Sequence, residues 1–176
     1  GKKNKGWAGQ TIELYLGSNT NSSQSPDFGN WELKLVPLVA KRTGELRVKE
    51  TMAITMINPI EVVSKEFEES HLFNKLQKIV VVARVFESQA DNHSLVHSVA
   101  SFDLDNPDMY EQVKSDYNLV RETIRTEGFS SLSGKMGKLV QPRTKGQGHG
   151  STSRAFYART GFVAHILGEG YRIPLP

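Results

Sequence analysis

The stretch SPDFGNWELK (residues 25–34) joins a polar turn to the start of an apolar segment. In Glu32-Leu33-Lys34, the period of two along a strand puts both charged side chains on one face and leaves Leu33 for the core. Asp27 precedes them in the turn. Two carboxylates and a lysine can hold Mg²⁺ against a phosphodiester. Ordinary strands also carry such residues as solvent-facing polar alternation, so the motif alone leaves both interpretations open.

The composition is that of one folded domain: 176 residues, 38% hydrophobic and 23% charged. No apolar run approaches the ~20 residues that a membrane span needs, so we expect no membrane partner. The absence of cysteine excludes disulfides, thiol catalysis and thiolate metal sites. These features favour a cytoplasmic protein. The chain begins with Gly rather than Met, and we expect the single domain over residues 1–176 to have been trimmed from a longer chain.

Positive charge gathers late in the chain, although the net charge is only +3. Residues 128–168 contain no Asp or Glu, while the acidic residues crowd into residues 61–127. The basic residues of this segment are Lys135, Lys138, Arg143, Lys145, Arg154 and Arg159. Such asymmetry is typical of a surface that binds a polyanion. A solvated loop whose charge is balanced by acids elsewhere in space is the alternative.

Apolar periodicity predicts helices and strands in alternating groups. The expected helices cover residues 3–17, 60–77 and 107–124. The expected strands cover residues 31–39, 51–57, 79–86 and 95–102, with a short one near 138–141, and residues 154–167 give a last strand and helix. The segment KRTGEL (41–46) predicts a hairpin turn between the first two strands. This order predicts an α/β fold with a mixed central sheet flanked by helices.

Several blocks of the sequence resemble one enzyme family in the same order along the chain. They are KGWAGQTIELYLG (5–17), ELKLVP (32–37), SHLFNKLQKIVVVA (70–83), KLVQPR (138–143) and RAFYARTGFVAHIL (154–167). The family is that of the MutH mismatch-repair endonuclease and the related GATC-cutting type II restriction endonucleases. The resemblance covers nearly the whole chain and implies the restriction-endonuclease-like PD-(D/E)xK fold.

The resemblance assigns catalytic roles by position. It makes Asp27 and Glu32 the metal ligands and Lys34 the catalytic lysine, with Glu13 supporting the metal site and Lys75 close to it. It implies Mg²⁺ as the cofactor, for which Mn²⁺ can substitute. Outside the resemblance, Glu13 could be a solvent-facing helix acid and Lys75 a surface lysine.

The resemblance also implies contacts with double-stranded DNA. The residues concerned are Lys5, Gln141, Arg143, Lys145, His149, Arg154 and Tyr157, with Tyr157 near the base that carries methylation. The family has a basic residue in the place of Gln141. Lys5 could instead be an ordinary surface lysine, His149 an exposed histidine, and Tyr157 a core aromatic residue.

Together these features predict a Mg²⁺-dependent endonuclease that cuts double-stranded DNA at a short, GATC-like site. The compact segment 144–153 and the short spacing between Asp27 and Glu32 favour a type II restriction enzyme. A mismatch-repair nicking enzyme of the MutH type, or a non-catalytic DNA-binding module of the same fold, are the alternatives. We expect a monomer in isolation or a dimer on DNA.

Overall fold

The computed structural model describes residues 7–15, 31–86, 95–146 and 152–169. The α-helices are α1 (Trp7–Tyr15), α2 (Pro59–Ser64), α3 (His71–Leu76), α4 (Pro107–Glu127) and α5 (Thr160–Glu169). The strands are β1 (Glu32–Ala40), β2 (Leu46–Val48), β3 (Met52–Met56), β4 (Ile79–Val85), β5 (Val96–Phe102), β6 (Val140–Thr144) and β7 (Arg154–Ala158). Two short 3-10 helices, η1 (Phe67–Glu69) and η2 (Phe129–Ser131), complete the described elements.

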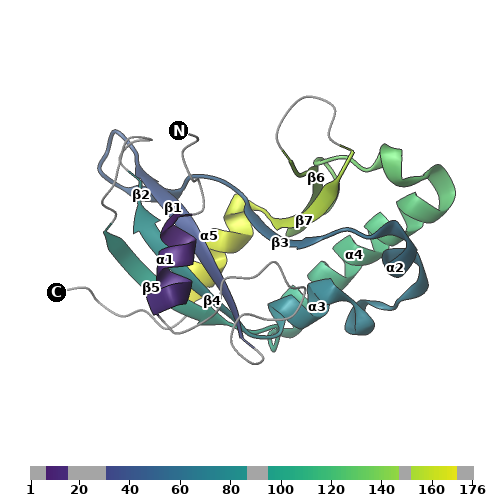
Figure 1. Cartoon of the computed structure of the whole chain (residues 1–176), viewed down its shortest axis with the longest axis horizontal. Helices are drawn as coiled ribbons and strands as arrows, with labels where there is room; N and C mark the ends of the chain where they lie inside the picture. The colour runs from purple at the N-terminus through teal and green to yellow at the C-terminus, as the bar shows by residue number, and fades with distance from the viewer. Residues whose placement is uncertain (1–6, 16–30, 87–94, 147–151, 170–176) are drawn as a thin grey trace.

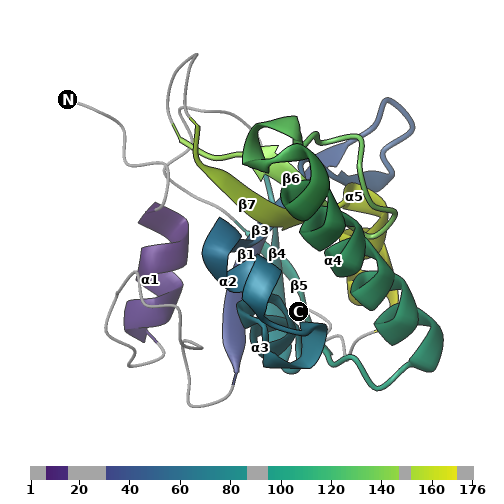
Figure 2. The same ribbon diagram turned by 90° about the vertical axis from the view of Figure 1, so that its right-hand side faces the viewer.

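The strands form two sheets rather than one continuous sheet. The first has the order β2-β1-β4-β5, in which β1 and β4 run parallel and the other pairs antiparallel. Helices α1 and α5 lie on its opposite sides (Figure 2). The second sheet, β3-β7-β6, is antiparallel and lies beside the long helix α4 (Figure 1). This mixed α/β architecture with flanking helices confirms the predicted fold class.

The first sheet is buried on both faces in its centre. In β4 the alternate residues Ile79, Val81 and Ala83 are fully buried and belong to the main core. Val36 of β1 belongs to the same core, which also includes apolar residues of α5. Leu33 is buried as predicted, on the face opposite Val36. The charged start of β1 therefore continues the core face of this sheet. Within the described ranges, no helix is long and apolar enough to cross a membrane.

The hairpin partner of β1 differs from the sequence prediction. The turn does form, with Gly44 at a φ of 83°, but it pairs β1 with β2, as in Leu38↔Val48. Residues 51–57 do contain a strand, yet β3 pairs with β7 in the other sheet. A tight turn fixes the register of the residues that directly follow it, so residues 46–48 take the hairpin position. The alternation of residues 51–57 predicts a strand, but it does not indicate which other strand pairs with it.

The single helix predicted over residues 60–77 is also wrong. It is divided into α2, η1 and α3, with extended backbone at Lys65 and Ser70. Phe67 is fully buried between these helices, and its ring centroid lies 5.2 Å from that of Phe73. Burying this ring interrupts the helix. The Ser70 side chain then accepts a hydrogen bond from the Phe73 N–H and begins α3.

Helix α4 confirms the predicted helix over 107–124 and runs three residues further. Asn106 caps its start before Pro107, and it ends at Gly128, whose φ is 91°. Asp116, only 3% exposed, points from this helix into the protein. Its carboxylate accepts hydrogen bonds from three successive backbone N–H groups, at 2.9, 2.7 and 2.8 Å. These belong to Lys138, Leu139 and Val140, so α4 fixes where β6 begins.

The turn before β6 is held from the other side by Arg159. Its guanidinium donates hydrogen bonds to the carbonyl oxygens of Gly134, Met136 and Gly137 at 3.0 Å each. Gly137 has a φ of 75°, and a Cβ there would lie 1.9 Å from the Val140 carbonyl oxygen. Only glycine therefore fits this position. Arg159 is committed to this turn, although it belongs to the basic segment.

We expect Asp116→Asn to destabilise the protein by about 2–4 kcal/mol, because the amide that replaces one oxygen leaves buried backbone N–H groups without an acceptor. Urea denaturation followed by circular dichroism measures this loss. Asp108→Asn is the matched control on the exposed first turn of the same helix. Equal stability of the two variants would contradict the anchoring role.

Candidate active site

The candidate site is built around Glu32, which is 1% exposed at the start of β1. Lys34 lies two residues further on the same face, and its Nζ is 2.5 Å from Glu32 Oε1. The Lys34 side chain is 22% exposed, so its amino group is more accessible than the carboxylate it pairs with. The predicted sharing of one strand face by these two side chains is what brings them together.

Lys75 reaches the same carboxylate from α3. Its Nζ lies 3.0 Å from Oε1 and 2.8 Å from Oε2 of Glu32, and its side chain is 7% exposed. Two lysines from different elements thus surround one buried carboxylate. A buried ionised carboxylate is stable only with hydrogen bonds and opposite charge, which these ammonium groups supply. Lys75 is therefore an interior residue of the site and not a surface lysine.

Lys145, directly after β6, belongs to the same neighbourhood. Its pKa lies below the ordinary lysine value, first because of desolvation and then because of the positive charges of Lys34 and Lys75. Part of its side chain remains exposed to solvent. Its backbone N–H donates to the Ser153 carbonyl oxygen at 3.0 Å, which joins the chain after β6 to the residues before β7. The end of the second sheet thus lies close to Lys34 of the first sheet and Lys75 of α3.

A groove of about 500 Å³ connects these two regions. One wall is β1 from Lys34 to Pro37, and another is the segment from Glu50 to Ala53. Arg143, Thr144 and Tyr157 of the second sheet complete it. The groove places the catalytic lysine predicted from the sequence in one surface depression with two of the predicted DNA contacts.

Arg143 and Tyr157 form one unit on the second sheet. The Gln141↔Tyr157 and Arg143↔Ala155 pairs put the two residues diagonally across β6 and β7. The Arg143 guanidinium carbon lies 5.5 Å from the centre of the Tyr157 ring, within cation–π range. Arg143 also donates a 2.6 Å hydrogen bond to the Thr51 hydroxyl. Thr51 is a residue that sequence reasoning missed, since nothing in its pattern indicated a partner 92 positions away.

The other predicted site residues occupy different surroundings. Glu13 is half-buried on α1, and Arg154 is half-buried with a 3.3 Å hydrogen bond from its guanidinium to the Thr152 carbonyl oxygen. Gln141 is only 5% exposed, within β6. Asp27, Lys5 and His149 lie outside the described residues. The structure therefore brings together Glu32, Lys34, Lys75 and Lys145, and of these Lys34 lines the groove.

The donor chemistry at Glu32 fits a hard divalent cation. Carboxylate oxygens are the ligands that Mg²⁺ prefers, and the Glu32 carboxylate already draws two cationic groups. Among the described residues, no group of three or more His, Cys, Asp or Glu side chains forms a ready-made metal cluster. A second acidic ligand would come from Asp27, as the sequence predicts.

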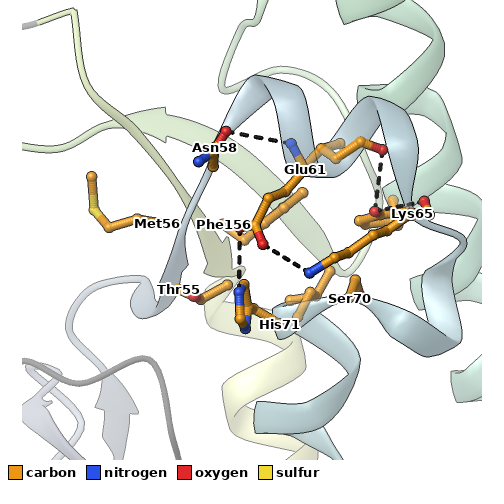
Figure 3. Close-up of a pocket in the computed structure, with 11 residues that line it drawn as sticks. Thr55, Met56, Asn58, Glu61, Lys65, Ser70, His71 and Phe156 are labelled. Atoms are coloured by element: carbon orange, nitrogen blue, oxygen red, sulfur yellow. Dashed lines mark hydrogen bonds and ion pairs between the residues drawn. The ribbon is translucent and has the colours of Figure 1, made fainter.

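A small second cavity lies between α2, α3 and the end of β3 (Figure 3). Glu61 points toward His71 and Lys65, with its carboxylate 3.3 Å from His71 Nε2 and 2.8 Å from Lys65 Nζ. The hydrogen bond from Lys65 is the main cause that lowers the pKa of Glu61 below its ordinary value. Tyr117 donates to the carbonyl oxygens of Val62 and Lys65 beside this cluster. These contacts tie α2 to α3, the helix that carries Lys75.

The sequence is similar to those of known DNA mismatch repair proteins. Residues 16–116 match the sequence profile of the family described as "DNA mismatch repair enzyme MutH". The DNA mismatch repair protein MutH of Vibrio cholerae is 27% identical over 187 residues, which cover 97% of this chain and 82% of the relative. The MutH protein of Actinobacillus pleuropneumoniae is also 27% identical, over 99% of this chain and 82% of the relative.

A relative of another kind is the type II restriction enzyme Sau3AI of Staphylococcus aureus. It is 25% identical over 94% of this chain, which spans only 37% of that enzyme. The profile match covers more than half of the 176 residues, and it includes β1 and α3, the elements that hold Glu32, Lys34 and Lys75. The chain belongs to the MutH family.

Proposed function

We propose that the protein is a Mg²⁺-dependent endonuclease that cleaves double-stranded DNA at a short, GATC-like site. The observation that carries this proposal is the continuity of the Glu32–Lys34 centre with the groove that Arg143 and Tyr157 line. A catalytic pair at one end and cationic and aromatic residues along the wall suit a polyanionic substrate. The family membership and the names of the relatives support the same class of substrate.

Each residue of the centre has a distinct role in this proposal. A divalent cation held by Asp27 and Glu32 would supply Lewis-acid stabilisation of charge on the scissile phosphate. Lys34, exposed to the groove, orients the attacking water or stabilises the charge that develops on the phosphate. Lys75 contacts both oxygens of Glu32 and so fixes the orientation of its carboxylate. Glu13 supports the metal site from α1.

The second sheet would read the DNA. Arg143 suits a bidentate contact with guanine in the major groove or a contact with phosphate, and Tyr157, which packs beside it, would contact the neighbouring base. Lys145 would hold the backbone close to the catalytic lysines. The remaining proposed contacts are Lys5, Gln141, His149 and Arg154. Gln141 would need to leave its buried position to take part.

Two kinds of DNA endonuclease fit this centre. The family description and the MutH relatives favour a mismatch-repair enzyme that nicks one strand when a partner activates it. The four residues between Asp27 and Glu32, the compact segment 144–153 and the likeness to Sau3AI favour a type II restriction enzyme that cuts both strands alone. We place the repair enzyme first, because the family profile bears its name. A cytoplasmic protein, monomeric alone or dimeric on DNA, suits either.

Lys34→Ala is expected to lower the cleavage rate of supercoiled plasmid DNA in Mg²⁺ by about a hundredfold or more, because the charge at the reacting phosphate loses its stabilising cation. Conversion of supercoiled to nicked or linear plasmid measures the rate. Lys41→Ala is the control, since Lys41 pairs with Glu45 in the turn between β1 and β2, away from the site. Equal cleavage by Lys34→Ala and the wild type would refute the assigned centre.

The same assay separates the two kinds of enzyme. A repair enzyme should be nearly inactive alone and give nicked circles, whereas a restriction enzyme should give linear DNA without a partner. Plasmids with and without adenine methylation at GATC test the proposed site. No product from either plasmid, with DNA binding unaffected by Mg²⁺, would support a non-catalytic binding module instead.

Arg143→Gln is expected to weaken DNA binding by about 1–3 kcal/mol, because one groove-facing cation is lost. Electrophoretic mobility shift in Ca²⁺ measures binding without cleavage. Arg47→Gln changes the net charge equally on β2, at the other side of the first sheet, and should leave binding nearly unchanged. Equal weakening by both variants would show that overall charge, rather than the groove, binds the DNA.

A further inference from the structure

Both oxygens of the Glu32 carboxylate are occupied by ammonium groups. Lys75 contacts both of them, at 3.0 and 2.8 Å, while Lys34 contacts only Oε1, at 2.5 Å. These are the same oxygens that a divalent cation would bind, at about 2.0–2.1 Å for Mg²⁺. The two ammonium groups already share Oε1, and a third cation on the same carboxylate would repel both of them strongly where water is scarce. Adding a metal ion to this arrangement is therefore unfavourable unless one lysine withdraws.

The surroundings of the two lysines differ in a way that decides which one withdraws. The Lys75 side chain is 7% exposed, reaches Glu32 from α3 and does not line the groove. The Lys34 side chain is 22% exposed and forms part of the groove wall. A cation that enters from the groove therefore meets Lys34 first. Lys34 can turn into the groove, where water surrounds its charge, whereas Lys75 has little solvent to turn to.

The buried carboxylate also explains why Lys75 should stay. Glu32 is 1% exposed, and removing all its counter-charge would leave an isolated buried anion. Lys75 meets this requirement whether or not a metal ion is present. The contact of Lys34 with Oε1 can then be exchanged without leaving the carboxylate unpaired.

We propose that Lys34 and the divalent cation compete for Glu32, so that metal binding releases the catalytic lysine from its ion pair into the groove. The inference rests on the proposed endonuclease function, and it adds a resting state to it. Without a divalent cation, the Lys34 amino group is held against Glu32. With the cation bound, Lys75 remains as the permanent counter-charge and Lys34 faces the position of the substrate phosphate.

Chemical labelling of the wild-type protein tests this without DNA and without cleavage. Reductive methylation, read residue by residue by mass spectrometry, reports how available each lysine amine is. Saturating Ca²⁺, confirmed by isothermal titration calorimetry, should speed labelling of Lys34 by about fivefold, the factor that loss of one modest ion pair permits. Lys75 should stay protected, and Lys41, exposed and paired with Glu45, should not respond to Ca²⁺.

Two variants make the test specific. Glu32→Gln should free Lys34 in the absence of Ca²⁺ and remove the effect of adding it. Lys34→Gln should bind Ca²⁺ more tightly than the wild type, because the competing charge is gone, whereas Lys41→Gln should bind it equally. Circular dichroism confirms that both site variants fold.

Absence of Ca²⁺ binding to the wild type would overturn the proposal, as would binding that leaves Lys34 labelling unchanged or that exposes Lys75 instead. These outcomes are separate from the plasmid assay. A protein that cuts DNA but shows no release of Lys34 refutes the competition alone. A protein that releases Lys34 with Ca²⁺ but cuts no DNA refutes the endonuclease function and leaves the competition standing.

Discussion

The burial of the Glu32 carboxylate constrains the rest of the site. A carboxylate that is 1% exposed must be balanced by positively charged side chains close to it. One ammonium group comes from the same strand, but the other comes from Lys75 on α3, so strand and helix must keep a fixed relation. The buried ring of Phe67 and the cap at Ser70 set where α3 begins, and contacts from Tyr117 hold the segment before it. The packing of residues 65–73 against α4 thus determines the position of Lys75.

The division into two sheets gives the molecule its groove. After the short hairpin strand β2, the chain leaves the first sheet and β3 joins β7 instead. The strand with Glu32 and Lys34 and the strands with Arg143 and Tyr157 consequently belong to separate sheets. A single sheet with the same residues would not enclose a space between them. The groove therefore arises because the chain passes from one sheet to the other between β2 and β3, and not from any local motif.

The sequence predicted what local patterns determine and missed what depends on distant partners. The buried strand at 79–85 and helix α4 follow from apolar periodicity, and the shared face of Glu32 and Lys34 follows from strand geometry. The hairpin partner and the break at Phe67 do not, because both depend on packing against residues far along the chain. The number of basic residues in the segment 128–168 also overestimates how many are available to bind DNA. Arg159 lies in that segment, yet it holds three carbonyl oxygens of a turn.

The anchoring of β6 has a consequence for how such a protein can diverge. Asp116 and Arg159 fix the beginning of this strand through backbone atoms alone, so they hold it whatever side chains it carries. Further along, Arg143, Thr144 and Lys145 are exposed and make few demands on the interior. Substitutions there can alter what the groove prefers without weakening the support beneath. The backbone contacts at the start of this five-residue strand thus support stability. The exposed side chains at its end, and just after it, can change specificity independently.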